Sequence, residues 1–413
     1  MSETALIIGG GHVAAELATS LRDQGWAGPI EVYSADTRLP YHRPPLSKAY
    51  MAGAVSADSL AIKPAAAYEK AQVQFHLGRR VRAIDVHQRT VTLDDGAQVA
   101  YASLALATGA RPRRLDVPGR LEAAQASNHH VLRALDDAEV IRAQCVPGAR
   151  LVIIGAGYIG LELAASAVAL GAQVTVIEVQ ERVLARVTGP EVSAFYAAAH
   201  RAAGVDLRLA TGVSALTCAD GRVSAVQCSD GKAVPCDLVV EGIGVEPCVE
   251  LAAAAGLALD NGIAVDGACR TSAAGVVAAG DCTSQPSVLY GRRIRLESVP
   301  NALEQARTAA ATLAGRERSN TQAPWFWSDQ FDLKLKSVGL LQGYDQCVLR
   351  GDPASRAFCA FYLREGRLLA VDTINRSPEF LAAKRIVAEQ LPVTAAQLAD
   401  ESLALKDLLP PAA

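Results

Sequence analysis

The pattern of apolar and polar residues predicts two strand–turn–helix units that look alike. Residues 5–8 (ALII) form an apolar run that ends in glycines and leads into an alanine-rich stretch, and residues 151–154 (LVII) do the same. Short apolar runs bounded by glycine are typical of strands buried on both faces of a parallel sheet. We therefore expect an α/β fold that contains two Rossmann-like nucleotide-binding domains.

A second repeated pattern follows each unit. VTLDDGAQVAYASLALATGARP at 91–112 aligns with VQCSDGKAVPCDLVVEGIGVEP at 226–247 at a constant offset of 135 residues. Each copy is typical of a strand, a DG turn, a second strand and an apolar strand that ends in glycine. Because two motifs repeat in the same order, we predict that the whole nucleotide-binding fold occurs twice.

The pattern after Pro247 predicts how the parts are connected. A helix, a short hairpin and a buried strand at 276–279 are expected, and this strand needs the sheet of the first fold. From Ala323 a tryptophan-rich stretch, a hairpin and a helix near 381–390 predict a C-terminal α+β domain. The expected domains are 1–112 with 248–322 (discontinuous), 113–247, and 323–413.

Composition narrows the function classes. The 413 residues carry a net charge of -3, which gives no global reason to bind nucleic acid or an acidic membrane. Nine scattered cysteines without CxxC spacing favour a reducing cytoplasm over a disulfide framework. The first strand begins at Ala5 and leaves no room for a signal peptide, so we expect a cytoplasmic protein. The glycines and Glu162 argue against a membrane-spanning helix in the apolar stretch 151–177.

The first glycine motif is Gly9-x-Gly11-x-x-Ala14. Gly9 permits the tight turn, Gly11 lets the backbone approach a pyrophosphate, and Ala14 is small enough for helix–strand packing. The helix that follows points its N-terminal N–H groups at the phosphates. Asp36, near the end of the next expected strand, is the candidate that binds a ribose.

The second glycine motif is complete, with Gly155, Gly157 and Gly160. Glu178 closes the next strand, and its carboxylate can accept both ribose hydroxyls of NADH while repelling a 2′-phosphate. No cation follows it directly, although arginines stand at 182 and 186. The sequence therefore favours NADH over NADPH.

Three further positions carry candidate chemistry. Asp281 ends a buried strand and suits the ribitol chain of FAD, or alternatively caps the next segment. The stretch ESVPNALEQA begins a helix whose N-terminus, aimed at a flavin, would stabilise negative charge. Two prolines in LPYHRPPLSKAYM (39–51) are expected to place Lys48 at a helix start, which is unfavourable for a cation and favours a functional role.

Taken together, these motifs resemble one family. LPYHRPPLSK, the two glycine motifs, ATGARP, AAGDC, ESVPNALEQA and PWFWSDQ resemble the NADH-dependent ferredoxin reductases that serve oxygenases, over nearly the whole chain. The resemblance implies FAD in the first fold, NADH in the second, and a C-terminal domain that closes over the flavin. It also implies that Lys48 lies near flavin N5 and pairs with Glu162, as the catalytic residues.

The resemblance assigns the remaining site residues. Those expected at FAD are Val13, Arg43, Lys48, Val81, Thr108, Gly109, Arg133, Asp281, Val299 and, close to the ring, Trp327. Those expected at NADH are Tyr158, Ile159, Glu178, Arg186 and Gly244. One departure is Ala35, where family members often carry an acid.

The implied reaction passes electrons from NADH through FAD to a two-iron two-sulfur ferredoxin, which supplies a haem-thiolate or ring-hydroxylating oxygenase. Hydride transfer between nicotinamide and flavin needs no metal and no protein nucleophile. Flavin disulfide reductases and NADH peroxidases would need cysteine in the segment that carries Lys48, and no cysteine precedes Cys145. Cys282 is expected to be a small buried hydrophobe. A rubredoxin reductase and a redox-sensing flavoprotein that resembles apoptosis-inducing factor are the alternatives.

The ferredoxin is expected to be acidic and to dock transiently on a monomer or weak homodimer. One candidate docking cluster consists of Arg292, Arg293, Arg295 and Arg307, and a second of Arg79 and Arg80. The alternative is that these arginines are solvated or bind FAD phosphates. His129 and His130 are expected on a loop, without a role.

Overall fold

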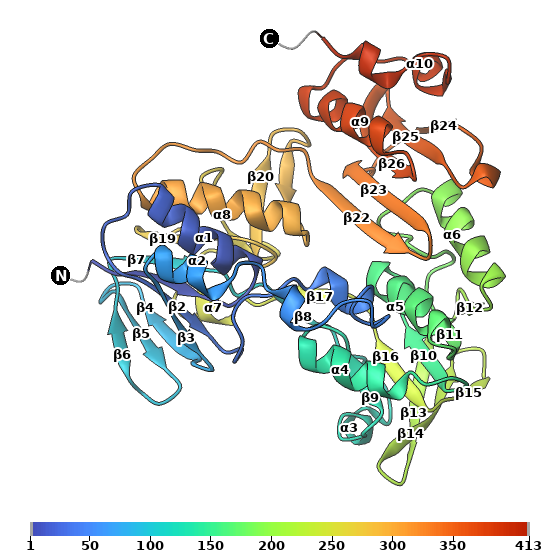
Figure 1. Ribbon diagram of the computed structural model, residues 1–413, viewed down its shortest axis with the longest axis horizontal. Coiled ribbons are helices and arrows are strands. Elements are labelled where there is room, and N and C mark those ends of the chain that lie inside the picture. The colour runs from blue at the N-terminus through green and yellow to red at the C-terminus, as the bar shows by residue number, and fades with distance from the viewer. Residues whose placement is uncertain (1–2, 411–413) are drawn as a thin grey trace. The chain divides into compact units, whose positions relative to one another are not determined.

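The computed structural model describes residues 3–410, which form two compact units (Figure 1). Unit 1 contains the residues up to His42, Asp58–Arg111 and Val245–Pro324. Unit 2 contains Arg43–Ala57, Pro112–Gly244 and the residues from Trp325 on. The chain passes between the units five times, and two of these passages lie at β8 (Ala110–Pro112) and at the start of β17 (Val245–Pro247).

Unit 1 is built on a parallel sheet of order β19-β7-β1-β2-β3. Its strands are β1 (Ala5–Ile8), β2 (Ile30–Ser34), β3 (Val73–Leu77), β7 (Ser103–Leu106) and β19 (Val276–Ala278). The prediction that the strand at 276–279 joins the first fold is confirmed, because β19 pairs with β7. The second nucleotide-binding fold is therefore inserted into the first.

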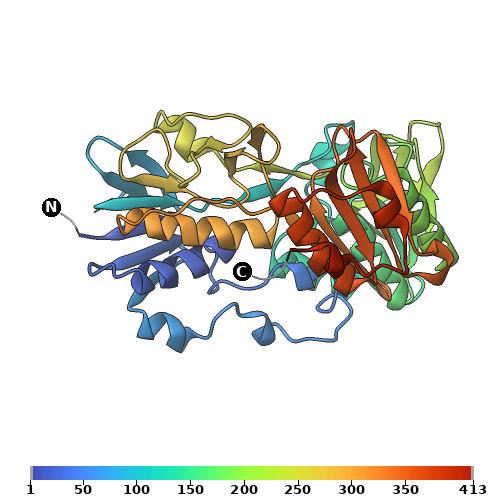
Figure 2. The same ribbon diagram turned by 90° about the horizontal axis from the view of Figure 1, so that it is seen from above.

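Helices and smaller sheets complete unit 1. α1 (His12–Asp23) packs against α8 (Val299–Leu313) on one face of the parallel sheet (Figure 2). The other elements are η2 (Asp58–Leu60), α2 (Ala65–Lys70), β4 (Val81–Asp85), β5 (Thr90–Leu93), β6 (Gln98–Ala100), α7 (Glu250–Ala254), β18 (Ile263–Ala264), β20 (Thr283–Ser287) and β21 (Arg292–Ile294). Alternate residues of β1 enter two apolar clusters, Ile7 on one face and Leu6 on the other. Burial on both faces explains the unbroken apolar runs.

Unit 2 repeats the arrangement with a parallel sheet of order β12-β11-β10-β16-β9. The strands are β9 (His129–Val131), β10 (Arg150–Ile154), β11 (Gln173–Ile177), β12 (Asp206–Arg208) and β16 (Leu238–Glu241). Around them lie α3 (Arg120–Ala123), α4 (Leu135–Gln144), α5 (Tyr158–Ala169), α6 (Pro190–Ala202), β13 (Val213–Ala219), β14 (Arg222–Cys228) and β15 (Ala233–Pro235). The expectation of a loop at His129 and His130 was wrong, since both belong to β9 and pair with β16.

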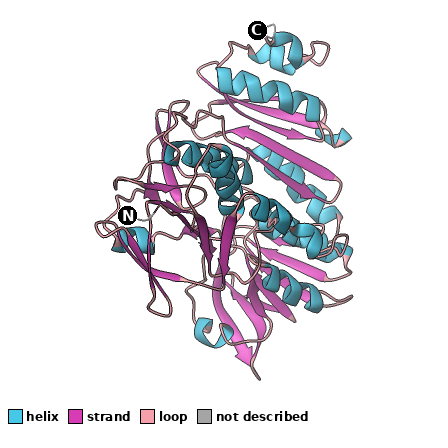
Figure 3. Cartoon of the chain, turned by 60° about the vertical axis from the view of Figure 1, so that its left-hand side comes forward, coloured by secondary structure: helices cyan, strands magenta, loops and turns pink. Residues whose placement is uncertain are grey.

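The C-terminal part of unit 2 is an antiparallel sheet of order β22-β23-β26-β25-β24, covered by α9 (Figure 3). Its elements are β22 (Trp325–Gln330), β23 (Leu333–Gly339), β24 (Gln346–Arg350), η3 (Pro353–Ser355), β25 (Phe358–Arg364), β26 (Arg367–Ile374), α9 (Ser377–Glu389), α10 (Ala395–Ala399) and η4 (Leu405–Leu408). The expected α+β character of this region is confirmed.

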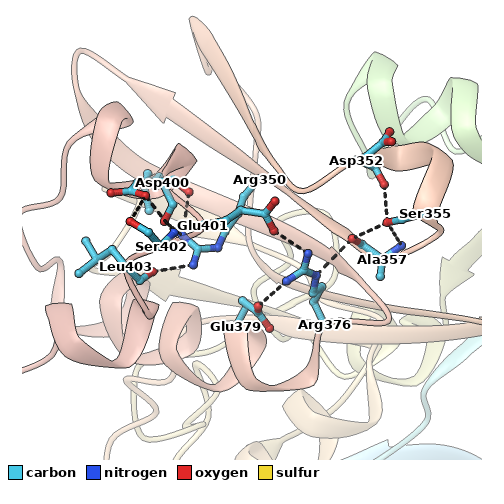
Figure 4. A network of polar contacts seen from close by, with 11 residues as sticks. Arg350, Asp352, Ser355, Ala357, Arg376, Glu379, Asp400, Glu401, Ser402 and Leu403 are labelled. Atoms are coloured by element: carbon cyan, nitrogen blue, oxygen red, sulfur yellow. Dashed lines mark hydrogen bonds and ion pairs between the residues drawn. The ribbon is translucent and has the colours of Figure 1, made fainter.

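A buried arginine fixes the C-terminal segment to this sheet (Figure 4). The guanidinium of Arg350, at the end of β24, donates to the backbone oxygens of Asp400 at 2.7 Å and Leu403 at 2.6 Å. Arg376 adds an ion pair to Glu401 at 2.7 Å. A buried guanidinium needs such acceptors, because an unpaired buried charge is strongly unfavourable. The last helices are therefore held by side-chain bonds as well as by apolar packing.

The expected fold class, two Rossmann-like folds plus a C-terminal α+β region, is confirmed. The three domain boundaries given above stay predictions.

Candidate functional site

The first glycine loop connects β1 to α1 in unit 1. Gly9 has φ +132°, and a Cβ there would collide with the carbonyl oxygen of Ala107. Gly11 is the N-cap of α1, and a Cβ there would meet no heavy atom within 4 Å. The backbone conformation and the packing against Ala107 therefore require glycine at position 9. Gly11 instead leaves open space where a ligand can approach the helix N-terminus. Ala14 is fully buried in the helix–sheet packing.

Asp36 lies two residues beyond the end of β2. Its carboxylate accepts hydrogen bonds from the backbone N–H of Arg38 at 3.1 Å and from the hydroxyl of Tyr41 at 3.3 Å. Ser34, the last residue of β2, accepts from the N–H of Asp36 at 3.1 Å. Asp36 thus caps its own turn, and no bond from it to the glycine loop is found among residues 3–410.

Gly280 and Asp281 follow β19, as predicted. Gly280 has φ +88°, and a Cβ there would lie 2.7 Å from Val13 on α1. The N–H of Gly280 donates to the Gln305 side chain of α8 at 2.6 Å. This close packing brings Asp281 to the side of the sheet from which α1 begins. Val13 therefore packs against Gly280, the residue that directly precedes Asp281.

The other predicted FAD residues are divided between the units. Unit 1 contains Val81, the first residue of β4, and Val299, the first residue of α8. It also contains Thr108, whose hydroxyl donates to the backbone oxygen of Cys248 at 2.7 Å. Gly109 follows Thr108 with φ +66°. Unit 2 contains Arg43, Lys48, Arg133 and Trp327.

Within unit 2 the structure brings Arg43 and Arg133 together. The guanidinium of Arg43 donates to the backbone oxygen of Arg133 at 2.7 Å. Trp327 lies in β22 with its ring 5.8 Å from that of Trp325. Arg43 and Arg133 are therefore in direct contact, whereas the contact of Trp327 is with its neighbour on the same strand.

The second glycine loop connects β10 to α5 and repeats the geometry of the first. Gly155 has φ +106°, and a Cβ there would lie 2.5 Å from the carbonyl oxygen of Gly242. Gly157 is the N-cap of α5 and faces open space, like Gly11. A Cβ on Gly160 would collide with the backbone of Gly155, so this position needs glycine for helix–strand packing.

Glu178 follows β11 directly and turns back to the second glycine loop. Its carboxylate accepts from the N–H of Ala156 at 2.7 Å and from the N–H of Gln180 at 2.9 Å. Arg182 is occupied elsewhere, because it donates to the backbone oxygens of Thr188 at 2.7 Å and Ala185 at 2.8 Å. The Glu178 carboxylate is therefore held beside the loop, and Arg182 is directed elsewhere.

Arg186 and Gly244, two of the predicted NADH residues, come close together. Arg186 is exposed, and its guanidinium would lie 3.3 Å from a Cβ placed on Gly244. Tyr158 and Ile159 are the first two residues of α5, directly after Gly157. The ring of Tyr158 stacks on Phe326 at 4.5 Å. The predicted NADH residues thus gather around the start of α5 and the ends of neighbouring strands.

The predicted pair of Lys48 and Glu162 is present. The Lys48 ammonium lies 2.6 Å from a Glu162 oxygen, with Glu162 only 3% exposed. Ser47 and Ser328 donate to the same carboxylate at 2.5 Å and 2.6 Å. Burial raises the pKa of Glu162, and Lys48 and the two serines act in the opposite direction. A buried carboxylate with three donors is held in one position.

The predicted helix start at Lys48 was wrong. Pro44–Ser47 form a single 3-10 turn, and Lys48 is its C-cap. The prolines do stiffen this turn, but they stand at its beginning, so Lys48 comes after it. At a C-terminus the cation is favourable, and the Lys48 ammonium donates to the backbone oxygen of Pro44 at 3.2 Å.

Ser47 and Ser328 were missed by the sequence analysis. Ser47 stands beside Lys48 in the LSK motif, which gave a weak signal. Ser328 lies in the middle of β22, where alternation puts Phe326, Ser328 and Gln330 on one face and the two tryptophans on the other. A serine on the buried face of a strand requires a polar partner, and that signal was available.

Four of the six arginines proposed for docking lie next to acidic residues of unit 1. Arg307 pairs with Glu16 at 2.7 Å, Arg295 pairs with Glu297, and Arg79 pairs with Asp95. Arg293 lies 3.4 Å from Asp260. Arg292 is exposed at the start of β21. Much of the expected positive charge is therefore neutralised locally.

The cysteines form no redox centre in this structure. All nine are free thiols. Cys282 is fully buried, and burial raises its pKa, as for an inert core residue. Residues 3–410 contain no group of three His, Cys, Asp or Glu side chains that could hold a metal ion. Over the same range, every helix is too short or too polar for a membrane span.

Comparison with known proteins identifies relatives over nearly the full length. Residues 3–306 match the pyridine nucleotide-disulphide oxidoreductase family, and residues 325–409 match the reductase C-terminal family. Putidaredoxin reductase CamA of Pseudomonas putida is 47% identical over 410 residues, which is 99% of this chain and 97% of that protein.

Two solved structures are similar to this chain over nearly its full length. The covalent putidaredoxin reductase–putidaredoxin complex has a TM-score of 0.95 and 47% identity, covering 98% of this chain and 97% of that one. The ferredoxin reductase for the CYP199A2 system from Rhodopseudomonas palustris has a TM-score of 0.94 and 41% identity, covering 98% and 99%. The predicted resemblance to ferredoxin reductases is confirmed.

Proposed function

The chain belongs to the pyridine nucleotide-disulphide oxidoreductase family, and we propose that it is an NADH-dependent ferredoxin reductase of an oxygenase system. Electrons pass from NADH through FAD to a ferredoxin, for which we propose a two-iron two-sulfur cluster. The observation that carries this proposal is the pair of glycine loops, in which Gly11 and Gly157 both leave a helix N-terminus open to a phosphate. Two such sites in one chain suit a donor nucleotide and a flavin nucleotide.

The residues present fit FAD in the first fold and NADH in the second. The space at Gly11, with Val13 and Asp281 beside it, would hold the FAD pyrophosphate and ribitol. Bound FAD would accept a hydride from NADH and release electrons singly to the ferredoxin. Glu178 and Gly157 would hold NADH, and the charge of Glu178 would exclude a 2′-phosphate.

Lys48 and Glu162 form the charged pair that we propose for the flavin side of the reaction. Glu162 lies on the same helix that begins at Gly157, so one rigid element would link the NADH loop to Lys48. Three donors hold the Glu162 carboxylate, which in turn fixes the Lys48 ammonium. A cation fixed in this way supplies a preorganised positive charge that needs no rearrangement during the reaction.

We further propose the domain limits and setting expected from the sequence. FAD would be bound by 1–112 and 248–322, NADH by 113–247, and 323–413 would cover the flavin. The nine free thiols support a reducing compartment such as the cytoplasm. A monomer or weak homodimer would meet an acidic ferredoxin transiently.

Stopped-flow reduction of the bound flavin tests the donor half of the proposal. NADH should reduce the flavin much faster than NADPH at low concentration. Turnover with a two-iron two-sulfur ferredoxin, with a rubredoxin as comparison, tests the acceptor half. Flavin reduction without turnover on any one-electron carrier would favour a redox-sensing protein instead.

Charge reversal tests the docking surface. Arg292 is the exposed candidate, so Arg292→Glu should raise the KM for ferredoxin and leave NADH reduction of the flavin unchanged. Arg79→Glu, at a residue already paired with Asp95, serves as a charge-matched control. An unchanged KM and salt-independent turnover would show that docking does not depend on these cations.

A further inference from the structure

A buried carboxylate in the C-terminal sheet has no part in the function proposed above. Asp372 on β26 is 2% exposed. It accepts hydrogen bonds from the hydroxyls of Ser337 at 2.6 Å and Tyr362 at 2.8 Å. Burial raises the pKa of Asp372 to about 6, and the two hydroxyls act in the opposite direction. Its negative charge is thus stabilised by neutral donors alone.

Asp372 belongs to a row of side chains that crosses three neighbouring strands. Phe326 on β22 is the register partner of Ser337 on β23, and Ser337 is the partner of Asp372 on β26. Register partners project from the same face of a sheet. Tyr362 pairs with Ala370, two residues before Asp372, and therefore shares that face.

One end of this row contacts Tyr158, the first residue of α5. The Tyr158 ring stacks on Phe326 at 4.5 Å with an interplanar angle of 26°. Burial raises the pKa of Tyr158, so the phenol is neutral. The charge of Asp372 also raises the pKa of Tyr158 and the hydroxyl of Ser337 lowers it, so both groups act on this phenol.

A second branch reaches the start of another helix. The Tyr362 hydroxyl accepts from the backbone N–H of Gly189 at 3.0 Å, and Gly189 is the N-cap of α6. A Cβ on Gly189 would lie 2.5 Å from the Tyr362 ring. One carboxylate in the C-terminal sheet therefore anchors the N-termini of both α5 and α6.

Counting protons shows that the arrangement needs an ionised Asp372. With Asp372 ionised, Ser337 and Tyr362 donate to its carboxylate, and the backbone N–H of Gly189 donates to Tyr362. Ser337 has then used its only hydrogen and can act toward Tyr158 only as an acceptor. A proton on Asp372 must be donated to Ser337 or to Tyr362. One chain then reverses or breaks, and a tyrosine hydroxyl loses its acceptor.

Other titratable groups face this cluster without supplying a cation to Asp372. They are Tyr158 and Glu162 on α5, Tyr196 on α6, Asp329 on β22, Cys347 on β24 and Tyr362 on β25. The Tyr196 hydroxyl is buried with no hydrogen-bond partner in the described part of the chain. The tyrosines remain neutral near pH 6. Burial raises the pKa of Glu162 as well as that of Asp372, so the Asp372→Asn variant is needed to identify which carboxyl titrates.

We propose that Asp372 is a positioning residue for the NADH site, which it controls by holding Tyr158 through Ser337. This inference rests on the proposed function, because Tyr158 is expected to line the NADH site directly after Gly157. With Asp372 ionised, Tyr158 is fixed against Phe326 and the start of α5 is preorganised for the nucleotide. With Asp372 protonated, Tyr158 is released and the affinity for the nucleotide falls.

Equilibrium binding of NAD⁺ to the flavin-loaded protein tests the proposal, because NAD⁺ leaves the flavin oxidised. Titration calorimetry between pH 5 and 8 should show binding that weakens on the order of fivefold as pH falls through about 6, the size expected for losing one hydrogen bond. Asp372→Asn should bind NAD⁺ weakly even at pH 8, and its affinity should not change between pH 5 and 8. The amide N–H must be donated to Ser337 or Tyr362, as the proton of the protonated acid is. Ser337→Ala should lose the step as well, although Asp372 still titrates.

The control is Asp332→Asn, which removes a carboxylate at an exposed site of the same sheet where Asp332 pairs with Arg356. It should keep the wild-type step. An infrared titration gives a readout that does not depend on the nucleotide. The band of a protonated buried carboxyl should grow in below about pH 6 in the wild type and in Ser337→Ala, and should be missing in Asp372→Asn.

The outcomes separate this inference from the function on which it rests. A wild-type protein that fails to bind NAD⁺ at any pH would overturn both. Normal binding with the same pH step in Asp372→Asn, or in Ser337→Ala, would overturn the link from Asp372 to Tyr158 alone. An infrared titration that is identical in wild type and Asp372→Asn would show that another carboxyl was observed.

Discussion

The two nucleotide-binding folds share their topology and differ in how an acid is used. Four strands of each sheet have the same order, with the glycine-loop strand in the centre, and the helices begin directly after Gly11 and Gly157. The fifth strand, at one edge, follows the other four in the chain in unit 1 (β19) and precedes them in unit 2 (β9). In unit 2, Glu178 bonds to the N–H of Ala156 inside the loop. In unit 1, Asp36 caps its own turn. The scaffold is therefore common, and the acid sets what each loop can bind.

Strand register identifies the position that differs. Ile154 pairs with Ile177 and Ile8 pairs with Tyr33, so the residue after each partner is Glu178 in unit 2 and Ser34 in unit 1. A Cβ on Gly10 would collide with the Ser34 hydroxyl, so this small side chain packs directly against the loop. A serine leaves the first loop without the fixed negative charge that the second loop carries.

Substitution of a glycine in either loop should have the largest effect on cofactor binding. Gly11→Ala and Gly157→Ala place a methyl group in open space, so both proteins should fold. Gly11→Ala should lose FAD, whereas Gly157→Ala should keep FAD and bind NADH roughly 100-fold more weakly, because the methyl group stands where the pyrophosphate approaches. Flavin absorbance and nucleotide titration measure the two effects.

The matched controls are Gly9→Ala and Gly155→Ala. Both positions have positive φ and meet backbone atoms, so these variants should lower the unfolding temperature as well as cofactor affinity. Loss of FAD from Gly157→Ala would contradict the assignment of one cofactor to each loop.

Removal of one partner from the buried pair should have the next largest effect. Lys48→Ala leaves the Glu162 carboxylate buried without a cation, and Glu162→Ala leaves Lys48 without its acceptor. Each should slow flavin reduction by about 10- to 100-fold, and the double variant should lose less than the product of the two. Stopped-flow rates measure this coupling.

Lys63→Ala provides the control, because Lys63 pairs with Glu16 at 3.2 Å in a more exposed setting in unit 1. That variant should reduce at the wild-type rate. Strictly multiplicative losses in the Lys48 and Glu162 series would show that the two residues act independently.

Substitution of Glu178 tests whether Glu178, and not Asp36, sets the preference for NADH over NADPH. Glu178→Gln removes the charge that repels a 2′-phosphate, so the preference for NADH over NADPH should narrow by about tenfold. Glu178→Arg should narrow it further. Asp36→Asn should leave the preference unchanged. If Asp36→Asn and Glu178→Gln changed the rate with NADPH equally, Glu178 would have no special role in excluding NADPH.

The smallest expected effect is on stability, through Asp372. Its pKa is about 6 in the folded protein and lies above the usual value for aspartate, so the folded state binds more protons than the unfolded state between about pH 4 and 6. The unfolding free energy should therefore fall as pH rises through this window, by at most a few kcal/mol, and stay low above it.

Asp372→Asn removes this contribution, so its stability relative to wild type should increase from pH 4 to 7. Thermal unfolding at a series of pH values measures the difference. A constant difference across that range would mean that Asp372 has an ordinary pKa.

Local motifs account for what could be predicted from sequence. The glycine loops, the Gly280–Asp281 turn and Glu178 depend on a strand, a turn and a helix that are adjacent in the chain. The repeat at 91–112 and 226–247 predicted that the fold occurs twice, and the buried strand expected at 276–279 correctly predicted the insertion. The pair of Lys48 and Glu162 followed only from the family resemblance, because the two residues are 114 positions apart.

Contacts that depend on tertiary packing were missed. Strand alternation could indicate that Ser328 needs a polar partner, but only tertiary packing shows that this partner is Glu162. Asp372 likewise bonds to Ser337 and Tyr362, which lie on other strands. The error at Lys48 has a different cause. Proline signals the start of a helical turn but not its length, and here the turn ends after Ser47.

The origin of β19 has a consequence for how the protein is made. The first fold has four of its five strands by Leu106, but its edge strand begins only at Val276 and its covering helix α8 at Val299. During synthesis, the edge of β7 therefore stays unpaired while the whole inserted fold leaves the ribosome. An unpaired sheet edge is prone to wrong partners, and long-range strand pairing is slow. The inserted fold can close its sheet first, so the N-terminal fold begins earlier on the ribosome and finishes later.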